Sequence, residues 1–525
     1  MPATASELPI DNSASADEMV AEIFGDSIQI VAGTADYTGD NRASGIYSDG
    51  DTVAPDVTPG DTGVILTTGR TTAFTNGSGD PNTSGSTTTN SSGQNNNADF
   101  NAAAGTNTYD AAYIEVDFIP DGDVMTMQFV FASEEYPEYV DSIYQDLVAV
   151  WINGELVELD IGDGDTDPGN LNSGTNENLF ISNVNDDYNT EMDGFTVTMT
   201  LTIPVDDGEI NSIKIGIADV GDSSYDSALL IAGGSVQSSL VAVGDSDTMY
   251  PAGTVTIDVL SNDQATGTLT ITHINNIPVI ANDTVELNTG QFVTLNSNGT
   301  ITVIGNGDPE NFNFTYTATD GTNTDTAYVE IEAVPCFVAG TMIRTPNGEQ
   351  PVETLCIGDL VQTKDNGDQP VRWIGGRTVP AVGDMAPICI RNGTFGPHDD
   401  LYVSPQHRIL VQDALAELLF GTGEVLVAAK DLVNDRSITK VQGGDVTYVH
   451  LMFDMHQVVY SQGLETESFL PGPQTTNLFE QQVVDEICRL FPELDPNTGN
   501  GYSPAARRTL RHFEAQLLTN NAKVA

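Results

Sequence analysis

The stretch GFTVTMTLTIPV, residues 194–205, decides the fold class of the first part of this chain. Its apolar side chains, from Phe195 to Ile203, occupy every second position, and threonines fill the positions between them. Period-two alternation is typical of a β-strand, because successive side chains point to opposite faces of a sheet. The stretch therefore predicts a strand with one dry, buried face and one wet face made of threonine.

The same alternation extends outward from this stretch. It recurs in three other runs, residues 113–120, 124–132 and 212–220. Asn153-Gly154 separates two further strand-like runs, and both turn positions of a type I′ hairpin need the positive φ that these residue types tolerate. Many strands with turn signals between them predict a β-sandwich over residues 1–239.

Other segments of the first part carry different signals. SADEMVAEIF, residues 15–24, is the one helical candidate. Residues 75–109 are rich in Gly, Ser, Thr and Asn and contain almost nothing to bury, so they predict a long exposed loop. Residues 240–333 contain several short strand-like runs, which predict a small immunoglobulin-like or cadherin-like sandwich.

Charge divides the chain at Cys336. Residues 1–335 hold 53 Asp and Glu against three Lys and Arg, whereas residues 336–525 hold 23 acids and 14 bases, all four Cys and five of the six His. Two different kinds of protein are therefore joined at this point. The formal net charge of −59 repels phosphate backbones and anionic lipid, which disfavours nucleic-acid and membrane-surface partners.

Neither a membrane span nor a signal peptide is expected. No run of about 18 apolar residues occurs, so no transmembrane helix is predicted. The first residues, MPATASELPIDNSASADEM, lack both the basic region and the apolar core of a secretory signal.

Acidic residues of the first part are candidate calcium ligands. The segment DIGDGDTDPGN places acids at alternate positions, as calcium loops do: Asp163, Asp165 and Asp167. A solvated acidic turn is the other interpretation, because no Glu closes the loop at the spacing of an EF-hand. Further candidates are Glu134, Glu135, Asp219 and Asp226, for which a surface or turn position is the favoured interpretation.

Four segments of the first part resemble the bacterial choice-of-anchor L domain. They are FVFASEEYPEYV (129–140), DLVAVWING (146–154), DGFTVTMT (193–200) and IKIGIADVGDSSYDSALLIAGGS (213–235). The resemblance covers most of residues 15–238 and implies an exported or surface-displayed module. Downstream, DVLSND (258–263) resembles the start of bacterial cadherin-like repeats.

From Cys336 onward the sequence resembles the hedgehog/intein (Hint) family over residues 334–473. The opening block has the Cys, the turn Gly340-Thr341, Asn347-Gly348 and the step Ile357-Gly358-Asp359. LYVSPQHRILV (401–411) resembles the family's T-x-x-H block, with Ser in the place of Thr. VTYVHLMFDMHQVVYSQGLETESF (446–469) resembles its last block. The resemblance implies an all-β self-processing domain.

Self-processing in this family is an intramolecular acyl transfer. The thiol of Cys336 would attack the carbonyl of Pro335 and convert the amide into a thioester, and proximity would favour the step. The departing nitrogen must be protonated, and an imidazole with a pKa of about 6.5 is a suitable donor. The resemblance assigns this role to His407 and a hydrogen bond with the scissile backbone to Ser404. The alternatives are a buried structural thiol and a core histidine.

A second histidine would act later in the reaction. The resemblance favours His456 over His450, because DMHQVVYSQG is similar to the family's H-N-F-V-x-N-G. Asp454 lies two residues before His456 and could fix its tautomer if both lie on one strand. Cys356 and Cys389 lie in apolar, strand-like contexts and are predicted to be core residues, and no CxxC spacing indicates zinc.

Departures from the family limit the outcome. The last block ends in GLETESFLPG without the closing Asn of an intein, so splicing is disfavoured. WIGGRTV stands where animal hedgehogs carry an Asp, which disfavours sterol transfer. Cleavage between Pro335 and Cys336 remains, with water, an amine or a thiol as acceptor. The domain would be a single-turnover cysteine autoprotease that needs no cofactor.

The tail, residues 474–525, carries helical signals. Apolar residues from Leu478 to Phe491 recur at helical spacing, and Ser503-Pro504 is typical of a helix start. Two helices that cap the Hint domain are expected, and a docking or secretion-recognition tail is the alternative.

The sequence thus predicts a mainly β protein with four parts: residues 1–239, 240–333, 334–473 and 474–525. We expect a secreted or cell-surface protein, exported without a signal peptide (by type I secretion, on family analogy), with a cell-surface or matrix partner. The rival hypothesis is a non-catalytic adhesin or calcium-binding surface protein whose Hint fold is idle.

Overall fold

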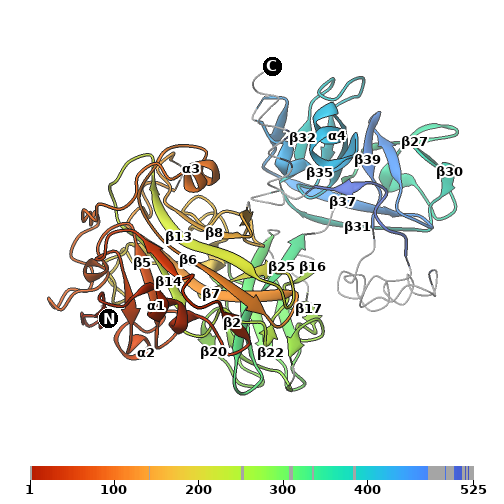
Figure 1. Ribbon diagram of the computed structural model, residues 1–525. Helices are drawn as coiled ribbons and strands as arrows, with labels where there is room; N and C mark the ends of the chain where they lie inside the picture. The colour runs from red at the N-terminus through yellow and green to blue at the C-terminus, as the bar shows by residue number, and fades with distance from the viewer. Residues whose placement is uncertain are drawn as a thin grey trace. The chain divides into compact units, whose positions relative to one another are not determined.

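The computed structural model describes most of the chain in two compact units. The first unit comprises residues 1–245, 258–301 and 312–330, and the second comprises 246–257, 302–311 and 331–525. The described residues are 3–140, 142–162, 164–249, 254–265, 267–306, 311–333, 336–381, 386–434, 436–470, 491, 502–510, 515 and 518. Both units are mainly β, as predicted (Figure 1). Within these ranges no helix has the length and apolar character needed to cross a membrane.

Two sheets form the body of the first unit. The larger contains, in spatial order, β1 (Ile10–Asp11), β4 (Ser44–Tyr47), β5 (Gly63–Thr67), β14 (Ser227–Ala232), β7 (Val124–Ser133), β11 (Gly194–Thr196) and β10 (Phe180–Ser182), and β12 (Met199–Pro204) also pairs with β7. The other contains β2 (Ile28–Ile30), β6 (Thr108–Pro120), β13 (Asn211–Val220), β8 (Leu147–Ile152) and β9 (Glu155–Val157), and β3 (Asp36–Thr38) pairs with β6.

One apolar core joins the two sheets. Phe129 and Leu229 of the larger sheet and Ile114 and Ile215 of the smaller belong to the same buried cluster. Burying a side chain of this size contributes about 1.5–3 kcal/mol, so the shared core holds the sheets together. The β-sandwich expected for this part of the chain is therefore present.

Short helices and turns close the sandwich. The α-helices of the described chain are α1 (Ala16–Ile23), α2 (Gly50–Val53), α3 (Ala98–Ala104) and α4 (Ala414–Phe420), and the 3-10 turns are Thr71–Ala73, Glu177–Leu179, Val352–Thr354 and Ala429–Leu432. The predicted helix over residues 15–24 is α1, which Ser15 and Glu18 cap reciprocally. Asn153 and Gly154 have φ values of 51° and 86° and join β8 to β9, as the hairpin signal predicted.

The threonine face of residues 194–205 is buried, which contradicts the prediction of a wet face. Thr196 and Thr200 are almost fully covered, and the strand divides into β11 and β12. The hydroxyl of Tyr328 donates to the carbonyl of Thr200 at 2.9 Å and accepts from its N–H at 3.0 Å. Tyr328, a residue of the same unit, thus covers part of this face.

The segments that follow the sandwich also form strands. Within the first unit these are β15 (Leu240–Val241), β18 (Gln264–Ala265), β19 (Thr270–Ile274), β20 (Ile277–Pro278), β21 (Thr284–Glu286), β22 (Phe292–Leu295), β24 (Phe312–Thr319) and β25 (Thr324–Ala333). The order β25-β24-β19-β20 forms one sheet, and β22 pairs with β21 in another. The strands β16 (Asp245–Met249), β17 (Thr254–Ile257) and β23 (Ile301–Ile304) lie in residues that belong, apart from Asp245 and Ile301, to the second unit.

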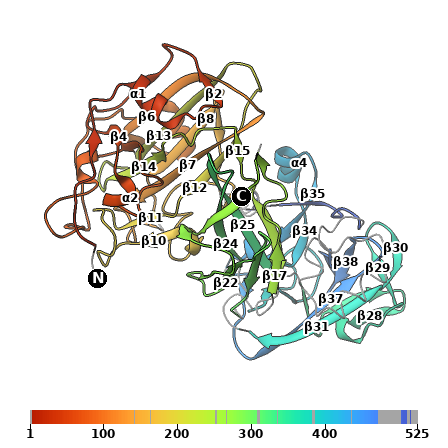
Figure 2. The same ribbon diagram turned by 90° about the horizontal axis from the view of Figure 1, so that it is seen from below.

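Two sheets also build the second unit after residue 335 (Figure 2). The first has the order β31 (Trp373–Pro380), β37 (Asp445–Met452), β26 (Phe337–Val338), β33 (Leu401–Val403), β32 (Ile388–Ile390) and β36 (Ile438–Lys440). The second has the order β28 (Gly348–Pro351), β27 (Met342–Thr345), β38 (Val458–Ser461), β39 (Leu464–Glu467), β34 (Arg408–Gln412), β35 (Glu424–Ala428) and β40 (Arg508–Thr509). The hairpin of β29 (Leu360–Thr363) and β30 (Gly367–Pro370) pairs with β38.

The core of this unit draws on both sheets and on the tail. Phe337, Ile409 and Val459 belong to one buried cluster, which also contains Ala515 and Leu518. Cys389 is buried as predicted, whereas Cys356 is exposed, because it lies in the turn that follows a 3-10 segment and donates its N–H to Asp359.

The tail departs from the predicted helix start at Ser503-Pro504. Residues 502–510 are not helical: they contain bends and β40, which pairs in parallel with β35. The hydroxyl of Ser503 accepts from His456 N–H at 2.8 Å instead of capping a helix. Ala515 and Leu518 are helical, so helical structure begins later than predicted. The other predicted tail helix lies outside the described residues, except for Phe491.

Candidate functional site

Strand register brings three side chains together at the start of the Hint-like segment. β26 lies between β33 and β37, and Phe337 pairs with Val403 on one side and Val449 on the other. Both pairings are antiparallel, so Cys336 falls opposite Ser404 and His450. Directly opposed residues in antiparallel strands project to the same face, with Cβ atoms about 4.5–5.5 Å apart. The long β31–β37 ribbon on which His450 lies is visible in Figure 1.

Hydrogen bonds bear out this register. The amide N–H of Cys336 donates to Ser404 Oγ at 2.7 Å, and Ser404 N–H donates to the Cys336 carbonyl at 2.9 Å. The thiol Sγ of Cys336 lies 3.4 Å from His450 Nε2. The nitrogen of the Pro335–Cys336 peptide bond is therefore held by a hydroxyl, while an imidazole contacts the adjacent thiol.

The thiol lies in apolar surroundings. Cys336 is 5% exposed and clusters with Ala381, Val446 and Tyr448. Burial raises the pKa of the Cys336 thiol well above its ordinary value, against a smaller opposing effect of Ser404. The group is thus a protonated thiol at neutral pH, and a base must remove its proton before it can act as a nucleophile.

His407 lies close to the same place. Its ring centroid is 4.3 Å from that of Phe337, the residue that follows Cys336, and its backbone N–H donates to the Ser404 carbonyl at 3.1 Å. The side chain is buried, and neither ring nitrogen has a hydrogen-bond partner among the residues that the structure describes. Burial lowers the pKa of His407 to about 4, although the charge of Glu467 opposes the shift. The expectation of a pKa near 6.5 is wrong for this reason, and the imidazole is neutral at neutral pH.

A buried carboxylate behind His407 was not anticipated from the sequence. Glu467 accepts from Arg408 N–H at 2.8 Å, and its other oxygen lies 3.5 Å from His456 Nε2. Burial acts to raise the pKa of Glu467, but the charge of Arg408 and the His456 hydrogen bond outweigh it and hold the value at about 2. Glu467 is therefore a permanent negative charge inside the domain. GLETESF gave no periodic signal for it, because Thr466, Glu467, Ser468 and Phe469 are all buried.

The structure places His456 beside Glu467 and not in contact with the thiol of Cys336. His456 Nε2 lies 3.0 Å from the Ser468 carbonyl, and Nδ1 accepts from Ala506 N–H at 2.9 Å. His450, which the resemblance ranked second, is the histidine in contact with Cys336. The predicted pairing of Asp454 with His456 is wrong: Asp454 is half exposed and forms an ion pair with Arg372 at 2.8 Å.

Aromatic side chains hold His450 in place. Its ring centroid lies 5.5 Å from that of Phe469 and 6.4 Å from that of Trp373. Gly375 is directly opposite His450 in the sheet, and a Cβ there would lie 2.4 Å from the Trp373 ring. The glycine thus leaves the space in which Trp373 packs beside the histidine.

Several acidic residues of the first unit are buried and accept hydrogen bonds. Four candidates expected at the surface are buried: Glu134, Glu135, Asp219 and Asp226. Donors from the polar tract 75–109 account for part of this burial, because Thr89 N–H donates to Asp226 at 2.8 Å and Thr83 N–H to the neighbouring acid Glu191 at 2.7 Å. The tract is therefore not a free exposed loop, and it contains α3 with the buried Phe100.

Two of the three alternating acids of the predicted calcium loop, Asp165 and Asp167, lie within the described residues. Asp163 lies outside the described residues, and Asp167 accepts from the N–H groups of Gly169 and Asn170 at 2.8 and 2.9 Å. Among the described residues, no three His, Cys, Asp or Glu side chains are grouped as metal ligands would be.

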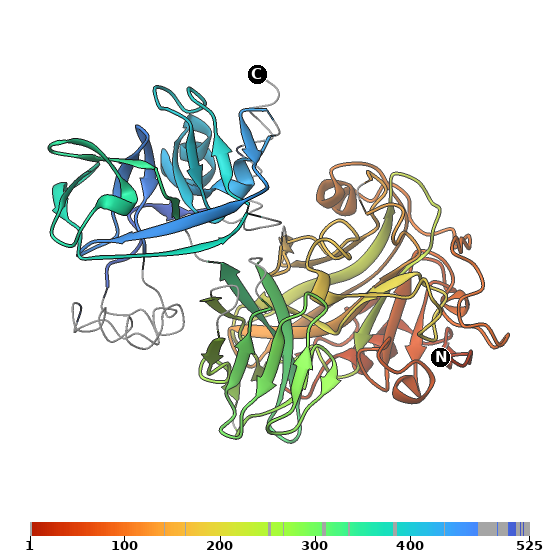
Figure 3. The same cartoon turned by 180° about the vertical axis from the view of Figure 1, so that it is seen from behind.

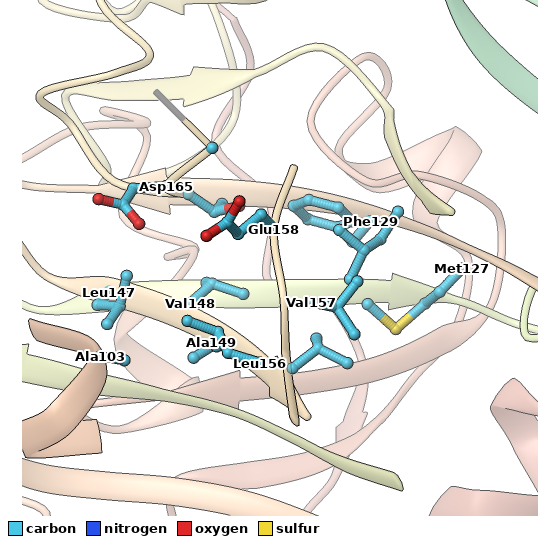
Figure 4. Close-up of a pocket in the computed structure, with 14 residues that line it drawn as sticks. Ala103, Met127, Phe129, Leu147, Val148, Ala149, Leu156, Val157, Glu158 and Asp165 are labelled. Carbon is cyan, nitrogen blue, oxygen red and sulfur yellow. The ribbon is translucent and has the colours of Figure 1, made fainter. Parts of the chain in front are cut away.

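A small pocket lies beside this loop. It is lined by apolar side chains such as Phe129 and Leu156, with Glu158 and Asp165 at its edge (Figure 4). Its volume for water-sized occupants is about 20 Å³, close to the room needed by one water molecule.

Comparison with known protein families agrees with this architecture. The chain is mainly β, as the view from behind in Figure 3 also shows. Its first part contains a sandwich, and the sheets of the second unit place a cysteine, a serine and a histidine together. The choice-of-anchor L domain family matches residues 9–237, and the Hint domain family matches residues 335–473. The chain thus carries one domain of each family, and the choice-of-anchor domain indicates an exported surface protein.

Similar solved structures were also found. The crystal structure of the gp41-1 intein is 14% identical, with a TM-score of 0.17, and covers 25% of this chain and 98% of its own. The crystal structure of the MchDnaB-1 intein is 11% identical, with a TM-score of 0.18, and covers 25% and 98%. Drosophila OTK, extracellular domains 3-5, is 11% identical, with a TM-score of 0.16, and covers 62% and 84%. No curated protein matches the chain.

Proposed function

We propose that the Hint domain cleaves its own chain between Pro335 and Cys336 through a thioester, and so releases or transfers the acidic N-terminal portion. The observation that carries the proposal is the pair of contacts at Cys336: its N–H on Ser404 Oγ at 2.7 Å and its thiol 3.4 Å from His450 Nε2. Ser404 thus contacts the amide that would be broken, and His450 contacts the thiol that would act as nucleophile.

The first step is a proton-neutral rearrangement. His450 Nε2 takes the thiol proton, and the thiolate of Cys336 attacks the carbonyl carbon of Pro335 to form a C–S bond. The C–N bond then breaks as the nitrogen of Cys336 receives a proton, which the imidazolium of His450 can return. The amide has become a thioester and a free amine, with no net change in protons or electrons. General acid–base help of this kind is worth about 10²- to 10⁴-fold in rate.

Ser404 and His407 would assist the same step. The hydrogen bond from the Cys336 N–H to Ser404 Oγ fixes the orientation of the departing nitrogen, which favours a reactive geometry. His407 is a neutral imidazole, so it can donate one N–H to charge that develops during the reaction, and its low pKa makes its protonated form a strong acid. His407 thus has a supporting role, and His450 is the residue that moves the thiol proton.

The thioester is then resolved by a nucleophile from outside the site. Water gives a carboxylate on Pro335, while an amine or a thiol gives a transferred chain. Because 53 of the acids precede Cys336, cleavage would separate a strongly negative module from the domain that processed it. We propose that this occurs in an exported protein, where release or attachment of a surface module has a use.

Intact-mass spectrometry of the full chain tests the proposal. Wild-type protein should yield fragments 1–335 and 336–525, in increasing amount when a thiol is added, and Cys336→Ala should stay whole. A wild-type chain that stays whole and folded under thiol would overturn the proposal. It would support the rival function, a display protein with an idle Hint fold, which the protonated, buried state of the thiol favours.

A further inference from the structure

The tail segment, residues 502–510, is bound to the Hint domain through several independent contacts. Arg507 pairs with Glu424 at 2.6 Å and with Asp365 at 2.8 Å. Tyr502 donates its hydroxyl to the Phe453 carbonyl at 2.6 Å, and β40 lies parallel to β35. The segment is therefore anchored on both sides of Ala506.

Within this anchored segment, Ala506 contacts His456 of the Hint domain. Its backbone N–H donates to His456 Nδ1 at 2.9 Å, while Ser503 Oγ accepts from the His456 backbone N–H at 2.8 Å. A backbone N–H can only donate, so Nδ1 must carry a lone pair. The ring hydrogen then sits on Nε2, which faces the Ser468 carbonyl at 3.0 Å and Glu467 Oε2 at 3.5 Å. One backbone group of the tail thus selects the tautomer of a fully buried imidazole.

We propose that residues 502–510 are a positioning element of the self-processing site: the Ala506 N–H fixes the Nε2–H tautomer of His456, which orients Glu467, the carboxylate that accepts from the backbone N–H of Arg408 next to His407. The inference rests on the proposed function and extends it to a segment outside the matched Hint range, 335–473. The tail would then be part of the processing machinery and not an independent appendage.

The path from the tail towards the thiol consists of contacts and one charge effect. His456 and Arg408 both bind Glu467, and the Glu467 charge acts on His407. His407 in turn packs on Phe337 beside Cys336. In the other tautomer of His456, Nε2 would carry a lone pair. It would then face two other acceptors, Glu467 Oε2 and the Ser468 carbonyl, with no hydrogen between them. Glu467 would have to move, and the field at His407 would change with it.

The test uses one position with two opposite variants. Ala506→Pro removes the N–H donor, and Ala506→Gly keeps it as the matched control. Ser503→Ala and Ser503→Thr, which remove and keep the hydroxyl, form a second pair that does not alter the backbone. In the uncleavable Cys336→Ala chain, ¹⁵N chemical shifts of the histidine ring nitrogens report the His456 tautomer directly. In the cleavable chain, thiol-induced cleavage is followed against pH.

We expect Ala506→Pro to give a mixture of His456 tautomers, a cleavage rate lowered by about tenfold, the loss expected for one hydrogen bond, and a displaced pH profile. Ala506→Gly should keep the single tautomer and the rate. A folded Ala506→Pro chain that retains both the Nε2–H tautomer and the wild-type rate would overturn the inference. Failure of the proposed function is a separate result: wild type would not cleave at all, while the tautomer measurement would still decide the role of Ala506.

Discussion

Replacing His450 with glutamine is the most informative change at the site. Glutamine keeps a buried polar side chain of similar length but cannot accept the thiol proton as a base. Because burial raises the pKa of Cys336, the variant should hold the thiol in its unreactive, protonated form. General-base catalysis contributes about 10²- to 10⁴-fold. The direct 3.4 Å contact places this case near the middle of that range, about 10³-fold, or about 4 kcal/mol of barrier.

The assay is the rate at which fragment 336–525 appears after thiol addition at pH 7, followed by mass spectrometry. His398→Gln is the matched control, because His398 is a buried histidine of the same domain whose contacts are with Phe395 and Asp399. Thermal unfolding of both variants verifies that they are folded. Raising the pH should recover part of the lost rate in His450→Gln, since solvent base then replaces the imidazole.

A His450→Gln chain that is folded and cleaves within a factor of about three of wild type would refute the reasoning. Equal losses in His450→Gln and His398→Gln would also contradict it, because the effect would then reflect loss of any buried imidazole and not the contact with Cys336.

Three further predictions concern other parts of the molecule. Ser404→Ala should slow cleavage by about tenfold or more, because the Cys336 N–H loses its acceptor, while Ser404→Thr should keep most of the rate; equal rates in time courses of the two variants would argue against the contact. Gly375→Ala should lower both thermal stability and cleavage rate, because a Cβ would lie 2.4 Å from the Trp373 ring beside His450; a variant with unchanged melting temperature and rate would contradict this. In the first unit, burial raises the pKa of Glu134 to about 9 and that of Asp146 well above its usual range, so the folded state binds more protons than the unfolded state. Its stability should therefore be highest near pH 4 and fall as the pH rises towards 9, by up to about 1.4 kcal/mol per pH unit for each such group. Denaturant titrations across this pH range should show that decline, with a shallower slope in Asp146→Asn, and a stability that rises with pH would contradict the assignment.

Local patterns predicted much of the secondary structure. Alternation identified the strands, the run SADEMVAEIF identified α1, and Asn153-Gly154 identified a hairpin, because each of these signals is contained within a few residues. The wet threonine face was wrong because it depended on a partner distant in sequence. Period-two alternation cannot show that Tyr328 covers Thr200 from another strand.

Choice of the second histidine shows where sequence resemblance is insufficient. The sequence around His456 is similar to the family's last block, whereas His450 reaches Cys336 through the register of β26 against β37. Register depends on which strands pair, and that information is not contained in either strand alone. Glu467 was missed for a related reason, since its partners Arg408 and His456 are brought together only by the pairing of β34, β38 and β39.

The polar tract and the tail also adopt structures that depend on partners distant in sequence. Residues 75–109 contain few apolar side chains, but their hydroxyl and amide groups are donors that buried carboxylates need in a unit with only three bases. In the tail, Ser503-Pro504 has the residue types of a helix start, but its hydroxyl is taken by His456 and the following residues pair with β35. Tertiary hydrogen bonds outweighed the local preference in both segments.

The thioester is the central claim, and trapping it with hydroxylamine tests it most directly. Hydroxylamine should convert the wild-type chain into a 1–335 fragment that carries a hydroxamate on Pro335, together with fragment 336–525, and it should leave Cys336→Ala intact. A wild-type chain without hydroxamate, or the same fragments from Cys336→Ala, would contradict the account.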